Sequence, residues 1–371
     1  MTTAAPASNA AGASDRLRFV WMFSRRADLA MLALPILVTG VAFFSTLRGD
    51  LPQQDTARLH AGWITAFLLG NTSHVLLTFL LLGARRDMLH ATPTQARNVA
   101  LASSIVFVVA MALMRLTQDD VWTRPFYETV TVIFATHHTI SQVKGFWSLY
   151  GLRGGQAGLP PPSSREREVQ KLFVPLSLLF IAIRWTLVAK IPEQGVGPFQ
   201  NVNPGDPAIL PYEVTYGLLA LWAGFSVVLL RSLFAYDTVN LSKVVYLGTH
   251  CAVVGIMIFA PAWGLLLSAG IHGLEYYFLT RRMLAPLPEE KSSRLTTALC
   301  WPAMIAAMSP ILFVGALRNP FGLSFLEGQA WRTWALMAVN ACVLAHYAAD
   351  AFIYRFRIPG IRKVAMARLG F

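Results

Sequence analysis

Long apolar runs constrain this chain more than any other feature of its sequence. A helix needs about 20 apolar residues to cross a bilayer, and the chain has about ten such runs. With 55% hydrophobic and 13% charged residues, it is too apolar for an ordinary soluble domain. We therefore predict an all-α fold: a polytopic integral membrane bundle of about ten transmembrane helices. The predicted spans are roughly 28–48, 60–84, 98–116, 125–150, 171–190, 212–235, 241–260, 262–282, 295–317 and 331–355.

The segments between and around these runs predict the domain organisation. The Gly/Pro-rich stretch 151–170 and the polar, Pro-rich stretch 191–211 cannot continue a transmembrane helix, so both are expected to be linkers. We expect one membrane domain over residues 28–357. A disordered cytoplasmic tail over 1–27 precedes it, and a basic cytoplasmic tail over 358–371 follows it.

The basic residues predict the orientation. The net charge is +12, and most Lys and Arg flank the apolar runs on one set of alternate connections, as Arg85 and Arg281 do. Because cytoplasmic loops carry the excess of Lys and Arg, both termini and the linker 151–170 are expected in the cytoplasm, with 191–211 external. This pattern accounts for the positive charge without a nucleic-acid partner. The expected location is the bacterial plasma (inner) membrane.

Several predicted spans carry histidine inside the apolar run. At a rise of 1.5 Å per residue, these histidines lie roughly 9 to 16 Å from the nearest cytoplasmic basic residue, the extremes being His138 and His74. Intramembrane histidines gathered at one depth indicate a common site. We predict metal ligands among His74, His137, His138, His250, His272 and His346.

Two carboxylates share helix faces with these histidines. Glu275 follows His272 by three residues and Asp350 follows His346 by four, so each pair projects from one side of its helix. Imidazole with carboxylate suits iron, and also zinc or manganese, and the lack of a Cys or Met cluster argues against copper(I). We predict one or two iron ions, with Glu275 and Asp350 as catalytic groups that ligate, bridge or relay protons.

The sequence does not decide which of the two adjacent histidines is a metal ligand. His137 and His138 point about 100° apart on a helix, so only one of them is expected to be a ligand. Any one of the histidines, taken alone, could instead hydrogen-bond a carbonyl or hydroxyl of a neighbouring helix.

An iron centre in the cytoplasmic leaflet can reach lipid-soluble molecules that enter between helices. This setting favours an integral membrane oxidoreductase of lipid metabolism that hydroxylates, desaturates or oxidatively cleaves a hydrophobic small molecule. The sequence has no nucleotide-binding glycine loop, so we expect electrons from a separate protein or a quinone. The alternatives are a transporter of metal ions, protons or a solute that uses the same polar layer, and a haem-binding electron-transfer protein.

The intramembrane histidines give two resemblances. In general style the chain resembles the integral membrane di-iron hydroxylases and desaturases, but it lacks their clustered HxxxH and HxxHH boxes. Apart from His137 and His138 its intramembrane histidines are single, one per helix. It also resembles the bacterial membrane carotenoid-cleaving dioxygenases, which are polytopic with intramembrane histidines on iron. Both resemblances imply an iron-dependent oxidation, and neither assigns a role to a particular residue.

Overall fold

A computed structural model describes residues 16–47, 74–75, 77–117, 123–188, 209–285 and 330–371. This part of the chain is almost entirely helical, which confirms the all-α prediction. The long helices are α2 (Arg25–Leu47), α5 (Gln95–Thr117), α6 (Thr123–Gln156), α7 (Ser164–Thr186), α8 (Val214–Leu233), α9 (Leu241–Phe259), α10 (Pro261–Leu284) and α13 (Ala330–Ile353). The short elements are α4 (Arg86–Leu89), α14 (Pro359–Leu369), β1 (Leu17–Arg18) and β2 (Val239–Asn240).

Four of the described helices, α5, α7, α8 and α9, are long and apolar enough to cross a membrane. Their length and composition identify the chain as a membrane protein. The predicted span 295–317 and most of the predicted span 60–84 lie outside the described residues, as does most of the linker 191–211.

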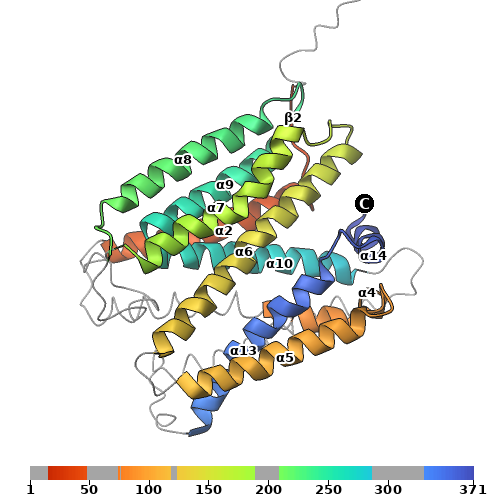
Figure 1. Cartoon of the computed structure of the whole chain (residues 1–371). Coiled ribbons are helices and arrows are strands. Elements are labelled where there is room, and N and C mark those ends of the chain that lie inside the picture. The colour runs from red at the N-terminus through yellow and green to blue at the C-terminus, as the bar shows by residue number, and fades with distance from the viewer. Residues whose placement is uncertain (1–15, 48–73, 76, 118–122, 189–208, 286–329) are drawn as a thin grey trace, which may run out of the picture.

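The described helices form two groups (Figure 1). Helices α2, α6, α7, α8, α9 and α10 supply most of one large apolar core, which also includes Val99 of α5 and Ala349 and Ile353 of α13. Helices α5 and α13 lie side by side (Figure 1). Between α5 and α13 the buried residues are Ala110, Met114, Met337 and Ala341. The small alanine side chains let the two helix backbones approach closely. Helix α6 touches both groups and therefore bridges them.

Helix α6 is longer than the apolar run that predicted it. Its 34 residues span about 51 Å, well beyond the roughly 30 Å hydrocarbon core of a bilayer. The helical ends therefore take up much of the predicted linker 151–170, since α7 begins at Ser164. Gly158, at φ +79°, lies in the turn that follows α6. The Ser163 Oγ accepts a hydrogen bond from the Glu166 backbone N–H at 3.1 Å and caps the next helix.

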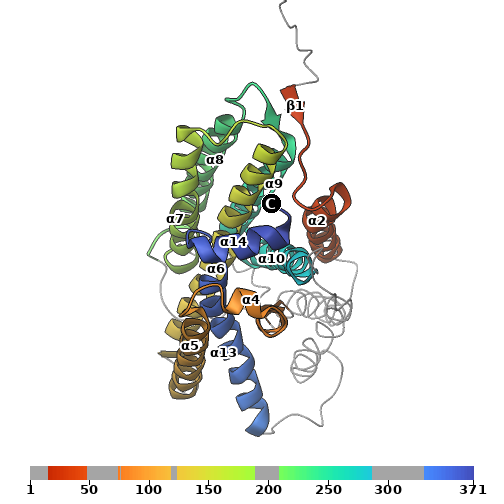
Figure 2. The same ribbon diagram turned by 90° about the vertical axis from the view of Figure 1, so that its right-hand side faces the viewer.

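Both predicted tails contain docked structure. Strand β1 pairs in parallel with β2. Asp28, which is 1% exposed, accepts hydrogen bonds from the Met22 backbone N–H at 2.7 Å and from the Tyr150 hydroxyl at 2.8 Å. The structure describes residues 16–27 of the predicted N-terminal tail, and β1 lies among them. The C-terminal segment forms α14, which lies against α10 and α4 (Figure 2). Long-range contacts of this kind leave no periodic signal in the sequence.

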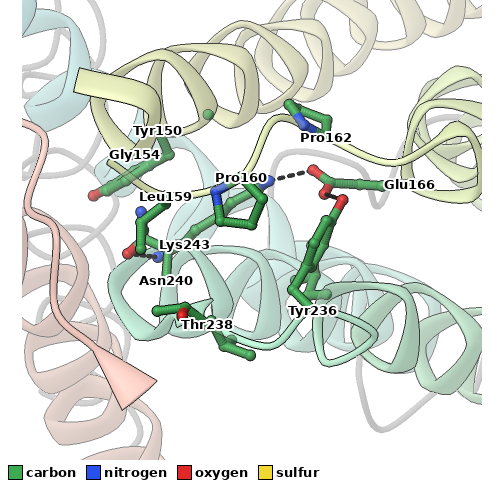
Figure 3. A pocket seen from close by; sticks show the side chains of 13 residues that line it. Tyr150, Gly154, Leu159, Pro160, Pro162, Glu166, Tyr236, Thr238, Asn240 and Lys243 are labelled. Carbon is green, nitrogen blue, oxygen red and sulfur yellow. Dashed lines mark hydrogen bonds and ion pairs between the residues drawn. The ribbon is translucent and has the colours of Figure 1, made fainter. Parts of the chain in front are cut away.

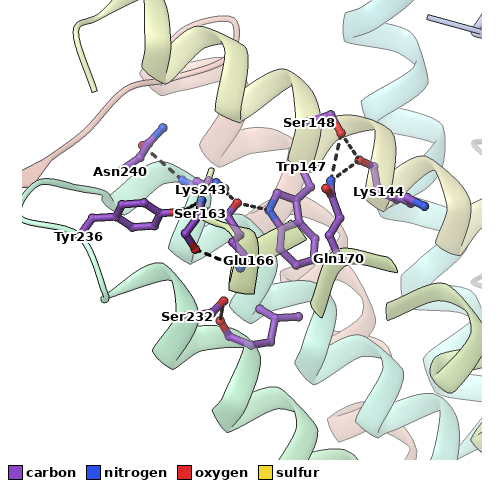
Figure 4. Close-up of polar contacts among 11 residues, drawn as sticks. Lys144, Trp147, Ser148, Ser163, Glu166, Gln170, Ser232, Tyr236, Asn240 and Lys243 are labelled. Atoms are coloured by element: carbon purple, nitrogen blue, oxygen red, sulfur yellow. Dashed lines mark hydrogen bonds and ion pairs between the residues drawn. The ribbon is translucent and has the colours of Figure 1, made fainter. Parts of the chain in front are cut away.

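A polar cluster at the end of α6 joins three helices through one buried carboxylate (Figure 4). Glu166 on α7 accepts hydrogen bonds from the Trp147 indole N–H at 2.7 Å and the Tyr236 hydroxyl at 2.6 Å, and it forms an ion pair with Lys243 on α9. We call these four residues the Glu166 cluster. Three of them, Glu166, Tyr236 and Lys243, border a small cavity of about 30 Å³ that Pro160 also lines (Figure 3). Burial and the hydrogen bond to Glu166 raise the pKa of Tyr236, so its hydroxyl stays protonated and can donate.

We predict that Lys243→Met lowers the free energy of unfolding by about 3–5 kcal/mol, because it leaves the Glu166 carboxylate buried without its cation. The double variant Lys243→Met/Glu166→Gln removes both charges and is expected to lose much less. Reversible unfolding of the detergent-solubilised protein measures both values.

The matched control is Lys171→Met, whose ion pair with Glu168 is two-thirds exposed and is worth about 0–1 kcal/mol. Equal destabilisation in the single and double variants would contradict a compensated ion pair.

Candidate metal centre

Ring nitrogens from three separate segments meet inside the bundle. The His74 Nε2 lies 2.9 Å from the His346 Nε2 and 3.1 Å from the His272 Nε2. His74 is in the helical stretch before α4, His272 is on α10 and His346 is on α13. All three side chains are at most 2% exposed. The segments that carry these histidines therefore present them to one another.

His138 on α6 and Asp350 on α13 complete the group. The His138 ring centroid lies 5.0 Å from that of His272 and 5.1 Å from that of His346. Ligand atoms of His74, His138 and His272 lie within 4.8 Å of one another, and so do those of His138, His346 and Asp350. We call these five side chains the histidine cluster.

Hydrogen bonding between the rings does not satisfy these nitrogens. A neutral imidazole nitrogen either carries a proton or accepts one, so the His74 Nε2 cannot donate to one ring and accept from another. The buried His138 Nε2 has no hydrogen-bond partner among the described residues. Buried polar atoms without a partner are rare, because their desolvation is costly. The same lone pairs suit a cation.

The spacing of the nitrogens also fits a metal ion. Imidazole nitrogens bind zinc at about 2.0–2.1 Å, which places two ligands at right angles about 2.9 Å apart and two tetrahedral ligands about 3.4 Å apart. The observed separations of 2.9 and 3.1 Å fall in this range. The set of imidazoles with one carboxylate is the one typical of iron, zinc or manganese.

Hydroxyl groups orient Asp350. Its Oδ1 accepts hydrogen bonds from the Thr78 and Tyr276 hydroxyls, both at 3.0 Å, and the Tyr354 hydroxyl donates to that of Tyr276 at 3.2 Å. The Oδ2 faces the His138 Nε2 at 3.7 Å. Hydrogen bonds of this kind fix the direction of a metal-binding carboxylate. Sequence reasoning missed Thr78, although its position four residues after His74 places it on the same helix face.

His250 and Glu275 form a separate pair beside the histidine cluster. The His250 Nε2 lies 2.9 Å from the Glu275 Oε1, and the Gln142 amide donates to the Glu275 Oε2 at 2.7 Å. Among the described residues, neither His250 nor Glu275 belongs to a group of three or more converging ligand atoms. Gln142 also approaches the His272 backbone carbonyl at 3.4 Å, so it links this pair to the cluster.

The two adjacent histidines on α6 have different surroundings. His138 joins the cluster and stacks on Tyr347 at a centroid distance of 4.2 Å. His137 is exposed, and its Nε2 lies 3.4 Å from the Ser141 hydroxyl one turn later. The helical rotation of about 100° between neighbours explains why only one of them reaches the cluster.

A large cavity borders the cluster. Its volume is about 920 Å³, and α5, α6 and α13 supply most of its lining. His138 and Asp350 form part of its wall, with His137, Gln142 and Tyr347 nearby. The rest of the wall is mainly apolar, which is typical of a binding site for an apolar small molecule.

The comparisons with known proteins do not indicate a function for this chain. No protein-family model matches the chain, and no curated protein or solved structure is significantly similar to it. The donor set, its burial and the adjoining cavity therefore carry the functional argument.

We predict that His272→Ala and His346→Ala each lower the affinity for the bound metal by about tenfold or more, because each removes a converging nitrogen. Elemental analysis of protein purified without chelators measures the metal content. The matched control is His137→Ala, which removes an imidazole next to His138 and is expected to keep the metal. Wild-type protein with less than about a tenth of an equivalent of any transition metal would contradict the metal site.

Proposed function

We propose that this chain is a non-haem-iron oxidoreductase of the bacterial plasma membrane that hydroxylates, desaturates or oxidatively cleaves a lipid-soluble substrate. One observation carries the proposal: two residues of the histidine cluster, His138 and Asp350, lie in the wall of a large, mainly apolar cavity. An apolar molecule bound in the cavity would therefore lie next to imidazole and carboxylate groups that suit iron.

The proposed topology has ten spans with both termini in the cytoplasm. The four apolar helices of the described chain and the one-sided distribution of Lys and Arg support it. In this arrangement the cluster lies in the cytoplasmic half of the membrane, where a substrate can enter sideways from the lipid. The bilayer is then both the solvent of the protein and the source of its substrate.

Each residue has a defined part in this proposal. His74, His138, His272 and His346 would hold one or two iron ions, and Asp350 would supply a carboxylate oxygen or accept a proton. Iron bound there would supply the activation of dioxygen. The Glu275–His250 pair and Gln142 fix the segment of α10 that carries His272. The Thr78 and Tyr276 hydroxyls keep Asp350 turned toward the cluster.

Two of the proposed reactions, hydroxylation and desaturation, need an external reductant, whereas oxidative cleavage does not. Hydroxylation places one oxygen atom of dioxygen in a C–H bond and reduces the other to water, with two electrons and two protons. Desaturation consumes the same reactants and removes two hydrogen atoms from the substrate as the C=C bond forms. Oxidative cleavage of a C=C bond instead places both oxygen atoms in the two carbonyl products. The electrons would come from a separate reduced protein or a quinol.

We predict that the iron(II)-loaded protein binds nitric oxide and gives the electron paramagnetic resonance signal of a high-spin iron–nitrosyl, because oxygen activation requires an open coordination position. His346→Ala is expected to lose the signal, and His137→Ala is expected to retain it. A purified protein with a Soret band, or an iron-loaded protein that binds no nitric oxide, would exclude this function. A Soret band would favour the haem-binding alternative.

A further inference from the structure

The cavity beside the histidine cluster is elongated along α6. Its lining on α6 runs from Thr131 to Leu149, about 27 Å along the helix axis. On α5 the lining runs from Ile105 to Thr117, about 18 Å. An extended hydrocarbon chain can lie along a lining of this length.

The cluster opens into the middle of this cavity. Along α6, His138 lies about 10 Å from Thr131 and about 16 Å from Leu149. Asp350 also lines the cavity and lies beside His138, with 3.7 Å between the Oδ2 and Nε2 atoms. A chain that fills the cavity therefore passes the cluster with its interior carbons.

The wall is apolar on both sides of the cluster. Toward the start of α6 it contains Phe134 with Leu113 of α5, and toward the end of α6 it contains Phe146 with Leu279 of α10. Among the described residues that line the cavity, Asp350 is the sole carboxylate, and none is Lys or Arg. Burial of apolar surface against such a wall favours hydrocarbon along the whole length of the cavity.

We propose that the substrate is an extended, largely unbranched hydrocarbon chain that lies along α6 with an interior carbon beside His138 and Asp350. This inference rests on the proposed function and narrows it to oxidation within a chain, not at its end. A chain anchored by an ionised head group would leave that group outside the apolar part of the cavity, because no described cation lines it.

Gly145 offers a substitution that blocks the cavity without touching the cluster. It lines the cavity on α6, and a Cβ atom added there would meet no atom within 4 Å. Leucine has a higher helix propensity than glycine by about 0.8 kcal/mol, so Gly145→Leu is expected to fold. Gly217→Leu on α8 is the matched control, because Gly217 has equal space around it and does not line the cavity.

The experiment uses the full chain in lipid nanodiscs and two photoreactive fatty acids, one with a diazirine at mid-chain and one with a diazirine at the terminal carbon. We expect the mid-chain probe to label peptides that contain His138 or Asp350, and the terminal probe to label the ends of the cavity. Gly145→Leu is expected to lose the mid-chain labelling, and Gly217→Leu is expected to keep it. Peptide mass spectrometry locates the labels.

Two results would overturn this inference. The first is labelling next to the cluster by the terminal probe alone, and the second is labelling that Gly145→Leu leaves unchanged. Metal content measured on the same samples separates this inference from the proposed function. Bound probe without metal would remove the proposed function and leave the chain-binding cavity, whereas bound metal without probe labelling would remove the cavity assignment alone.

Discussion

A polar side chain inside an apolar helical bundle must find a polar partner, because neither lipid nor core supplies one. In this protein, that requirement brings four histidines from four separate segments to one place. His74, His138, His272 and His346 cannot all satisfy one another through hydrogen bonds, since each ring nitrogen holds at most one proton. A cation bound where α6, α10 and α13 meet would relieve this conflict.

Two carboxylates, Asp350 and Glu275, differ in their hydrogen-bond partners. Asp350 has one oxygen held by Thr78 and Tyr276 and the other turned toward His138. Both oxygens of Glu275 are engaged, one by His250 and the other by Gln142. Asp350 is therefore placed to act on a ligand or substrate, whereas Glu275 is placed to position the helix behind it.

The Glu166 cluster contrasts with the histidine cluster. Its buried carboxylate is matched by the Lys243 ammonium and by two neutral donors, so its charge is compensated within the protein. It fastens the end of α6 to α7 and α9, and none of its four residues lines the large cavity. In the histidine cluster, by contrast, the His138 Nε2 has no hydrogen-bond partner among the described residues, and His138 lines the large cavity. A buried polar group whose hydrogen bonds and charge are matched within the protein indicates a structural role. A buried polar atom without a hydrogen-bond partner beside a cavity indicates a binding site.

The sequence by itself determined the helical class, the membrane setting and the placement of Asp350 on the face of His346. These follow from apolar run length and from the 3.6-residue period, which fix where a side chain lies along its own helix and in which direction it points from that axis. Only the tertiary structure decided that His138 and not His137 joins the cluster, that Glu275 turns to His250, that Thr78 holds Asp350, and that a long cavity runs along α6. The physical reason is that helical periodicity leaves the rotation and crossing of each helix against its neighbours undetermined, and packing between segments distant in the chain sets both.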